Sequence, residues 1–354
     1  MKIITVESLQ EIIRRHGFAH FMLSLILGLK RDFSRWETFT NIPRPAMHVP
    51  GGVLELMPIC DNEKYYSFKY VNCHPKNPRI GKQTVIATGQ LSEISTGYPL
   101  IFSEMTLLTA FRTAATSALA TDLMSRKDSH VLAIIGTGAQ SEFQIEGIQL
   151  IRTITEVRYF DIDKKAMDKF AKHMSKKNFK LTRCSSAKEA VKGADIVTVC
   201  TACKANVSVL KNAWVTKGMH INAIGGDTVG KTELEVSILD RCRIVVEYFD
   251  QAFIEGEIQQ LTREKAQKLI CAQMHELVTG YKKVRRNKDD ITLFDAVGIA
   301  MEDYTALRLT YELVKEYGIG QEVNITPIVT DPKDLMGTLQ ITKAEQVERG
   351  ILTV

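Results

Sequence analysis

The sequence predicts an α/β protein built on a doubly wound parallel sheet, with a smaller antiparallel sheet ahead of it. Two observations indicate this fold class. From residue 131 onward, short apolar runs alternate with helical segments, which is the pattern of a parallel sheet. From about residue 40 to 105, prolines and glycines punctuate short strands instead, which predicts a small antiparallel sheet. A chain of 354 residues has room for both units.

The N-terminal third combines helices with the antiparallel strands. Residues 1 to about 30 have apolar positions at helical spacing and few breakers, so we expect this segment to be helical. A long helix is also expected from Ser103 to about Lys127, with Ser103 as its cap and Glu104 as an acid in its first turn. Between these helices we expect a turn at 95–99 and strands at 53–57, 65–71 and 84–89.

The rest of the chain alternates between the two kinds of element. Strands are expected at 131–135, 157–160, 180–183, 196–200, 220–224, 244–247 and 291–294. Helices are expected between the early strands, at 141–151, 164–174 and 187–192. A further helix at 302–317 ends at Gly318, and the tail from about 320 contains Pro327 and Pro332 and is expected to be irregular.

Composition is that of an ordinary globular protein, with 45% hydrophobic and 25% charged residues. The net charge of +5 is small and the two signs are interspersed, which disfavours nucleic acid as a partner. The apolar segment 18–27 is too short to span a bilayer, and no signal peptide is evident, so we expect no membrane contact. The seven cysteines form no disulfide framework, and a reducing, cytoplasmic setting is therefore expected.

The first motif that indicates chemistry is a Gly-x-Gly turn after the first apolar run of the parallel sheet. Gly136 allows the tight turn, and Gly138 lets the backbone approach a pyrophosphate at the N-terminus of the next helix. Ser141 stands where the usual pattern has a third glycine. The following strand ends in Asp161, near the spacing of the acid that binds the adenosine ribose. The pattern predicts a dinucleotide site; Asp161 favours NAD over NADP, while the lysines at 164–165 leave that preference open.

The second motif is the stretch 219–234, in which an apolar strand runs into Gly225, Gly226 and Asp227. In an open α/β sheet, ligands lie just beyond the carboxyl ends of the strands, and glycines there let the backbone come close to them. Asp227, with Lys231 four residues later, is therefore a candidate for chemistry. The alternative is a polar loop that happens to contain an Asp.

Isolated charges in apolar surroundings form a third group of candidates. By the period of two in a strand, Glu55 shares a face with apolar neighbours, and Lys69 interrupts another apolar strand. Arg44 lies between two prolines. Arg112 lies in a nearly uncharged helix, where an anion contact competes with a side chain that snorkels at the helix surface. A carboxylate and a lysine on inner faces suit a site that binds an amino acid.

The pair Cys200 and Cys203 has redox or zinc spacing, but no second Cys or His pair stands at a zinc-ribbon distance. The pair also follows a predicted strand, where a cysteine is an ordinary buried residue. We therefore expect no metal, and we expect Thr201 and its backbone to line the cofactor cleft.

The chain resembles the ornithine cyclodeaminase/mu-crystallin family in the segments 136–144, 223–227 and 230–234. It resembles the ornithine-converting members of that family in four further segments, 55–58, 68–72, 111–117 and 254–261. The likeness keeps the same order from about residue 30 to 335. It implies a homodimer in which residues 1–115 and 319–354 form an α+β dimerisation and substrate-binding domain around a Rossmann-type NAD-binding domain at 116–318. It also implies conversion of L-ornithine to L-proline and ammonia by internal hydride transfer to and from bound NAD.

The resemblance also implies roles for single residues. Asp227 matches the acid/base residue and also contacts the substrate, and Glu55 matches a second active-site carboxylate. Three cations match the positions that hold the substrate carboxylate, the last of them also near the cofactor: Arg44, Lys69 and Arg112. Ala296 stands where we expect a Ser beside the nicotinamide, so a backbone contact survives there but a hydroxyl contact does not. The other implied cofactor contacts are Thr84, Gly136, Gly138, Ala139, Gln140, Asp161, Thr201, Ala223, Ile224, Gly225, Gly226 and Lys231.

Other functions within this resemblance remain open. Lysine cyclodeaminase, alanine dehydrogenase and ketimine reductase are the enzyme alternatives, and a non-catalytic, crystallin-like nucleotide-dependent binder is the alternative of another class. The joint presence of Arg44, Lys69, Arg112 and Asp227 disfavours the binder. Ornithine and lysine differ by one methylene, which is worth only about 1–3 kcal/mol in a pocket.

Overall fold

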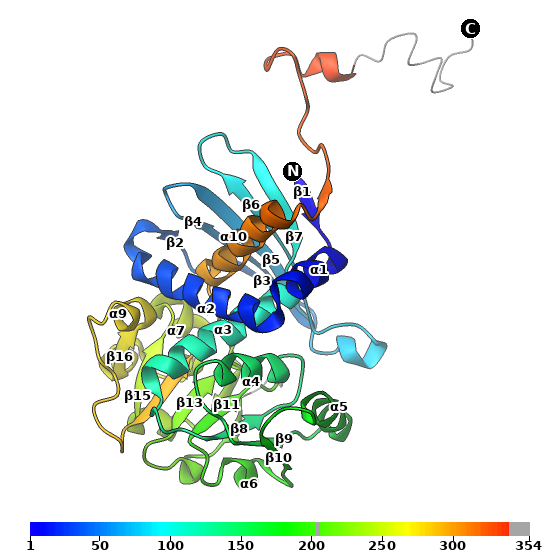
Figure 1. Cartoon of the computed structure of the whole chain (residues 1–354). Helices are drawn as coiled ribbons and strands as arrows, with labels where there is room; N and C mark the ends of the chain where they lie inside the picture. The colour runs from blue at the N-terminus through cyan, green and yellow to red at the C-terminus, as the bar shows by residue number, and fades with distance from the viewer. Residues whose placement is uncertain (203–205, 340–354) are drawn as a thin grey trace.

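Two sheets organise the chain in the computed structural model, which describes residues 1–202 and 206–339. Figure 1 shows the N-terminal sheet and its helices above the parallel sheet, with the last described residues running away from the upper part. The mixture of a mainly antiparallel sheet and a doubly wound parallel sheet confirms the predicted fold class.

The N-terminal sheet has the strand order β18-β1-β7-β6-β5-β4-β2, with β3 also paired to β4. The strand β1 runs parallel to β7, and the other pairs are antiparallel. Along β4 burial alternates with a period of two, and Glu55 lies on the buried face as predicted. The bounds are β1 Lys2–Ile4, β2 Thr40–Asn41, β3 Ala46–Val49, β4 Gly52–Cys60, β5 Tyr65–Cys73, β6 Val85–Glu93, β7 Pro99–Glu104 and β18 Gln321–Glu322.

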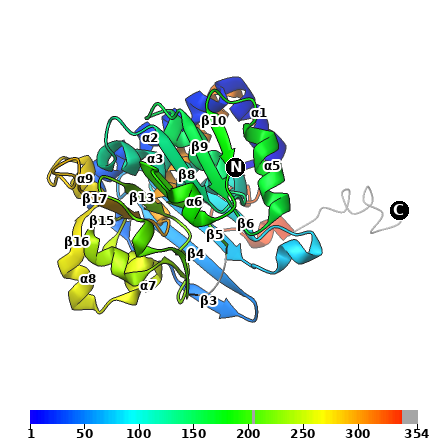
Figure 2. The same ribbon diagram turned by 90° about the horizontal axis from the view of Figure 1, so that it is seen from below.

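The second sheet is parallel throughout, in the order β10-β9-β8-β11-β13-β17-β15-β16. After β10 the chain crosses to the other side of β8 and adds β11, so the strand order reverses between β8 and β11. Figure 2 shows the edge strand β10 and its neighbour β9 near α5. The bounds are β8 Val131–Ile135, β9 Glu156–Phe160, β10 Lys180–Arg183, β11 Ile196–Val199, β13 His220–Ala223, β15 Cys242–Val246, β16 Ile270–Gln273 and β17 Ile291–Asp295.

Helices α2, α3 and α10 form the centre of the molecule. They pack on one another and, through residues such as Phe21, Met105 and Tyr304, bury the inner face of the N-terminal sheet. The α3 helix also packs against α4 and β13, so it joins both sheets. The helices are α1 Val6–His16, α2 Phe18–Ser34, α3 Thr106–Met124, α4 Ser141–Gln149, α5 Lys164–Met174, α6 Ala187–Val191, α7 Phe249–Glu255, α8 Arg263–Leu269, α9 Met274–Val278 and α10 Ala300–Tyr317.

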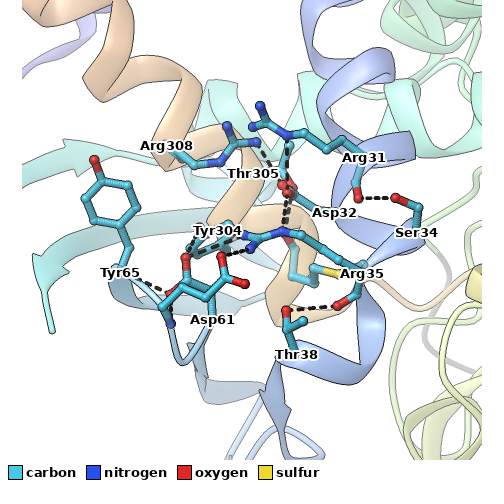
Figure 3. Close-up of polar contacts among 12 residues, drawn as sticks. Arg31, Asp32, Ser34, Arg35, Thr38, Asp61, Tyr65, Tyr304, Thr305 and Arg308 are labelled. Atoms are coloured by element: carbon cyan, nitrogen blue, oxygen red, sulfur yellow. Dashed lines mark hydrogen bonds and ion pairs between the residues drawn. The ribbon is translucent and has the colours of Figure 1, made fainter.

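Buried polar contacts fix α10 against α2 and the end of β4 (Figure 3). Asp32 is fully buried, and its Oδ2 accepts hydrogen bonds from Thr305 Oγ1 at 2.7 Å and from Arg308 Nη2 at 2.8 Å. The Tyr304 hydroxyl donates to Asp61 Oδ2 at 2.6 Å. Buried charges that are paired in this way hold their elements in one arrangement. These contacts lie just after the first turn of α10, which contributes Glu302 and Asp303 to the site.

The prediction that residues 1 to about 30 are helical is correct from Val6 onward and wrong at the start of the chain. Residues Lys2–Ile4 form β1 along β7, and the helical part is broken at Gly17, where φ is +86°. Glycine adopts this conformation readily, and the Gly17 N–H closes the first helix by donating to Ile13 O at 2.8 Å. The apolar spacing of this segment reports its buried face correctly but contains no signal for the change of direction.

The predicted start of the long helix is also wrong. Ser103 and Glu104 end β7, and α3 begins only at Thr106. Glu104 nevertheless serves the helix from outside, because its Oε1 accepts a hydrogen bond from Leu107 N at 2.9 Å. Shorter elements missing from the prediction include β16 and β18, and the pair β12 Asn206–Leu210 and β14 Thr232–Leu234.

In the part of the chain that the structure describes, no helix has the length and apolarity to cross a bilayer.

Candidate functional site

The site lies where the parallel sheet reverses its strand order, at the carboxyl ends of β8 and β11. Gly136 follows β8 with φ of +96°, and a Cβ there would come within 2.8 Å of Cys200 O. Only glycine fits this contact between the two loops. At Gly138, by contrast, a Cβ would meet nothing within 4 Å, so the turn is open on the side that leads into α4. Crevices at such switch points are where α/β sheets bind dinucleotides.

Asp161, just after β9, is held at this turn. Its Oδ2 accepts hydrogen bonds from Thr137 N at 2.6 Å and Thr137 Oγ1 at 3.2 Å, and its Oδ1 accepts one from Asp163 N at 2.9 Å. At the start of α4, the buried Oε1 of Gln140 has no hydrogen-bond partner among the described residues. The glycine turn, the helix N-terminus and the carboxylate next to them fit a dinucleotide with its pyrophosphate at α4.

The Gly225-Gly226-Asp227 turn follows β13 and faces the same crevice. Lys231 Nζ donates to Asp227 Oδ1 at 3.1 Å and to Thr201 O at 3.0 Å, so it ties this turn to the loop after β11. The Lys231 side chain is only 4% exposed, whereas that of Asp227 is 39% exposed. Burial alone would lower the pKa of Lys231, but Asp227 and then Glu233 raise it. Lys231 is therefore a fixed cation, and the Asp227 carboxylate is the accessible member of the pair.

Arg44 joins the N-terminal unit to this turn. Its Nη2 donates to Asp227 O at 2.9 Å and also binds Glu255, while its Nε lies 3.2 Å from Glu55 Oε1. The side chains of all three charged partners are at most 7% exposed. Burial acts to lower the pKa of Arg44, but Glu255 and Glu55 raise it above its usual value. Arg44 is thus a permanent buried cation between two carboxylates.

A second ionic cluster joins β5, α3 and the first turn of α10. Asp303 lies between two cations, 2.8 Å from Lys69 Nζ and 3.1 Å from Arg112 Nε. Arg112 Nη1 also donates to Glu302, and Arg112 is fully enclosed rather than snorkelling at the helix surface. Burial and then Arg112 lower the pKa of Lys69 to about 8, although Asp303 acts in the opposite direction.

The structure brings most of the predicted residues together. Arg44 contacts both Glu55 and the backbone of Asp227, and its Nη1 donates to Gly298 O at 3.2 Å. Arg112 lies against the same Gly298, and Lys69 is joined to Arg112 through Asp303. Ala296 lies at the same edge, since its N–H donates to Ala223 O at 2.9 Å. Separate from this cluster, Ala139 and Gln140 start α4, and Asp161 lies at the Gly-x-Gly turn.

Thr84 lies further away, immediately before β6, where its carbonyl accepts a hydrogen bond from His74 N at 2.7 Å. The next residue, Val85, pairs with Cys73, whose thiol is close enough to Lys231 to raise the pKa of that lysine. The start of β6 therefore faces the same crevice from the side of the N-terminal sheet.

Sequence reasoning missed the acidic partners of the cations. Glu255 and Asp303 are the main ones, and Glu247 is another, because it acts to raise the pKa of Arg112. The Oε2 of Glu247 also accepts hydrogen bonds from Val297 N and Gly298 N at 2.9 and 2.7 Å. Burial and the neighbouring Glu302 raise the pKa of Glu247 well above its usual value. A signal existed for Glu255, which lies in the segment 254–261 that carries part of the family resemblance.

The predicted absence of a metal concerns the Cys200 pair in particular. The Cys200 thiol donates to Gly136 O at 3.1 Å, and burial raises its pKa. Cys203 lies outside the described residues. Within 1–202 and 206–339, no three or more His, Cys, Asp and Glu side chains are grouped so that they could hold a metal ion.

The doubly wound sheet, the open Gly-x-Gly turn and the charged crevice define a dinucleotide-binding α/β protein with a polar substrate site beside the cofactor site. A sequence model of the ornithine cyclodeaminase/mu-crystallin family matches residues 10–318. The chain belongs to this family.

Relatives and solved structures agree with this assignment. The chain is 43% identical over 336 residues to the ornithine cyclodeaminase of Agrobacterium fabrum, and the aligned region covers 95% of this chain and 94% of the relative. It is 34% identical to the alanine dehydrogenase of Archaeoglobus fulgidus, over 79% of this chain and 86% of that one. Among solved structures, a lysine cyclodeaminase that recognises L-lysine, L-ornithine and L-2,4-diaminobutyric acid has a TM-score of 0.88 at 29% identity, covering 95% and 99% of the two chains. An archaeal alanine dehydrogenase dimer with bound NAD has a TM-score of 0.85 at 30% identity, covering 92% and 99%.

Proposed function

We propose that this chain is an NAD-dependent ornithine cyclodeaminase, which converts L-ornithine to L-proline and ammonia. The observation that carries the proposal is the charge of the crevice. Four cations there face more carboxyl groups than they can neutralise: Glu55, Asp227, Glu247, Glu255, Glu302 and Asp303 face Arg44, Lys69, Arg112 and Lys231. Even with Glu247 protonated, the carboxylates are in excess. A diamino acid, which has two ammonium groups and one carboxylate, matches this excess better than a neutral amino acid such as alanine.

The reaction requires no net oxidant. NAD, held by the Gly136 and Gly138 turn and by Asp161 beside the N-terminus of α4, would supply reversible hydride transfer at the substrate α-carbon. The distal amine attacks the α-carbon, and the α-amino group leaves as ammonia. Attack requires a neutral amine, so a carboxylate must accept the proton of the distal ammonium. We assign this role to Asp227, since its side chain is partly exposed and lies at the carboxyl edge of the sheet. Lys69, Arg112 and Arg44 orient the substrate carboxylate. Glu55, beside Arg44, is a further acid of the site.

The test is to incubate the protein with L-ornithine and substoichiometric NAD, while proline, ammonia and NADH are followed. Proline and ammonia in many-fold excess over NAD, without lasting NADH, are the expected result. Accumulation of NADH would indicate a simple amino-acid dehydrogenase instead. Tight NAD binding with no product would indicate a crystallin-like binder. Parallel reactions with L-lysine and L-alanine decide between the remaining family activities.

The cofactor preference gives a prediction of its own. Because Asp161 lies at the turn that would receive the adenosine ribose, replacing it by Ser should narrow the preference for NAD over NADP by about ten- to a hundredfold, or about 1.4–2.8 kcal/mol. The ratio of the two dissociation constants measures this. The matched control is Asp163→Ser, the same change at the N-cap of α5, where the Asp163 Oδ1 accepts from Lys165 N and a Ser hydroxyl can replace it. An unchanged ratio in Asp161→Ser, or an equal change in the control, would mean that another group reads the ribose.

We also propose that the protein is a cytoplasmic enzyme of proline biosynthesis and a homodimer, with residues 1–115 and 319–354 as the dimerisation and substrate unit and 116–318 as the NAD-binding unit. Apolar side chains on the sheet face opposite α10 support the dimer: Leu56, Tyr66, Tyr70 and Ile86 are 36–40% exposed and lie on one face by register. We expect light scattering to give twice the chain mass, and Leu56→Glu with Tyr70→Glu to give one chain mass. A monomeric parent protein would contradict this.

A further inference from the structure

A buried carboxylate lies directly behind the Gly225-Gly226-Asp227 turn. Glu233 belongs to β14 and is only 1% exposed. A Cβ built on Gly225 would fall 1.8 Å from Glu233 Oε2, so the carboxyl group occupies the space that glycine leaves free behind the turn. Thr201 Oγ1 donates to Glu233 Oε1, whereas Oε2 is buried without a hydrogen-bond partner among the described residues. Burying a carboxyl oxygen without a hydrogen bond costs free energy of folding, so the presence of Glu233 here requires an explanation.

Glu233 is held rigidly from the side away from the crevice. Its own N–H and that of Leu234 donate to Glu257 at 2.7 and 3.1 Å. The N–H of Glu257 in turn donates to Asp295 Oδ1 at 2.8 Å. Burial and then Asp295 raise the pKa of Glu257 well above its usual value, and burial raises that of Asp295 to about 7. The supports of Glu233 are therefore themselves buried acids, and they do not supply it with a counter-charge.

The counter-charge comes from Lys231, the same lysine that pairs with Asp227. Four titratable groups face Glu233 from the packed elements: Lys231 and Asp227 from the turn, Cys200 from the end of β11, and Glu257 behind it. Of these only Lys231 is a cation. It is shared between Asp227, which it contacts at 3.1 Å, and Glu233, which it attracts from a greater distance. The two carboxylates therefore compete for one buried positive charge.

We propose that Glu233 is a positioning residue that sets the basicity of Asp227 through this shared lysine. The inference rests on the proposed function, in which Asp227 accepts the proton of the distal ammonium. While Glu233 is protonated, Asp227 alone neutralises Lys231 and is a weaker base. When Glu233 ionises, the charge of Lys231 is divided, and Asp227 becomes a stronger proton acceptor.

The pH dependence follows from this coupling. The pKa of Glu233 is raised to about 7: burial is the largest cause and Asp227 adds to the rise, while Lys231 and the Thr201 hydroxyl oppose it. Because a raised carboxyl pKa means that the proton leaves only near neutral pH, turnover should increase as the pH rises through about 7. The increase should be about tenfold, which is the effect of one pKa unit on a coupled base.

The kinetic test compares Glu233→Gln with the parent enzyme between pH 5.5 and 9, at saturating L-ornithine and NAD. The Gln side chain has the same shape but cannot ionise, so we expect the ionisation near pH 7 to vanish from the kcat profile and kcat to stay at its low-pH value. Thr201→Val is the matched control. It removes the hydroxyl that donates to Glu233 Oε1 but leaves Glu233 titratable, so its profile should keep the ionisation, moved to higher pH. An unchanged ionisation in Glu233→Gln, or an equal loss of kcat at every pH in both variants, overturns the proposal.

A second measurement does not depend on turnover. Infrared difference spectra of the NAD-bound protein, parent minus Glu233→Gln, isolate the protonated-carboxyl band of Glu233 during a pH titration. The same band is then isolated without Asp227, by subtracting the spectrum of the double variant Asp227→Asn, Glu233→Gln from that of Asp227→Asn. Its midpoint should lie at lower pH than in the parent protein, because the Asp227 charge raises the pKa of Glu233. A midpoint that does not move disproves the coupling, even if the protein acts on another amino acid. A moved midpoint without proline formation would disprove only the proposed substrate.

Discussion

Replacing Asp227 by Asn is expected to reduce turnover of L-ornithine by about a thousandfold while NAD still binds. Asn has nearly the same size as Asp but cannot accept the proton of the distal ammonium, and a positioned general base contributes on the order of 10²–10⁴-fold. Cofactor binding should persist because Lys231 keeps its other hydrogen bond, to Thr201 O at 3.0 Å, and the glycine turn is unchanged. The effect should therefore appear in kcat, with little change in the NAD dissociation constant.

Single-turnover measurements of proline formation, together with calorimetric titration of NAD, separate these two quantities. The control is Asp250→Asn, the same chemical change in a surface carboxylate that pairs with Arg263 outside the crevice. This control should keep normal turnover, since an exposed pair of this kind is worth little. Turnover by Asp227→Asn within a few fold of the parent enzyme would remove Asp227 from the proton-transfer step.

The parallel sheet was predictable because its signals are local. Its central strands β8, β11 and β13 are runs of four or five residues that are buried on both faces, and β8 was predicted with the bounds 131–135 that the structure shows. The Gly136 turn was equally readable, because a positive φ and a close approach to a neighbouring loop both demand glycine. Where local sequence and burial agree in this way, the element and its position can be read from the sequence.

The N-terminal region was less predictable because its elements are decided by distant partners. Lys2–Ile4 becomes a strand only because β7 offers it an edge, a hundred residues further along the chain. Ser103 and Glu104 resemble a helix start, and Glu104 does cap α3, but pairing with β6 keeps both residues in a strand. Tertiary contacts override local preference in both places.

The site shows the same division. Glu55 and Lys69 could be placed on inner faces from the period of two alone. Their roles in the ionic clusters could not, because Glu255 and Asp303 come from helices whose packing the sequence does not specify. Their sequence neighbours identified Arg44, Lys69 and Arg112 as unusual, whereas only the structure shows a buried carboxylate beside each of them. This pairing has a consequence for stability as well as for substrate binding.

Replacing Arg44 by Met is expected to lower the free energy of unfolding by about 3–5 kcal/mol and to abolish ornithine binding. The substitution keeps the length of the side chain but leaves Glu55 and Glu255 buried without their cation, and removal of one partner of a buried ion pair costs this much. It also removes the hydrogen bond from Nη2 to Asp227 O, which links the N-terminal unit to the catalytic turn. Denaturant unfolding and calorimetric titration with L-ornithine measure the two effects.

The pH dependence of this loss distinguishes the ionic explanation from lost packing. Burial raises the pKa of Glu255, Arg44 opposes that rise, and Glu55 adds to it. Without Arg44 the pKa of Glu255 rises further, so the folded variant holds its proton to higher pH than the unfolded chain does. An acid of this kind destabilises the fold as the pH rises, and the deficit relative to the parent should therefore be larger at pH 8 than at pH 5. Adding Glu255→Gln to Arg44→Met should recover part of the stability at pH 8. A deficit that is equal at both pH values, with no recovery in the double variant, would mean that Arg44 stabilises the fold through packing and not through charge.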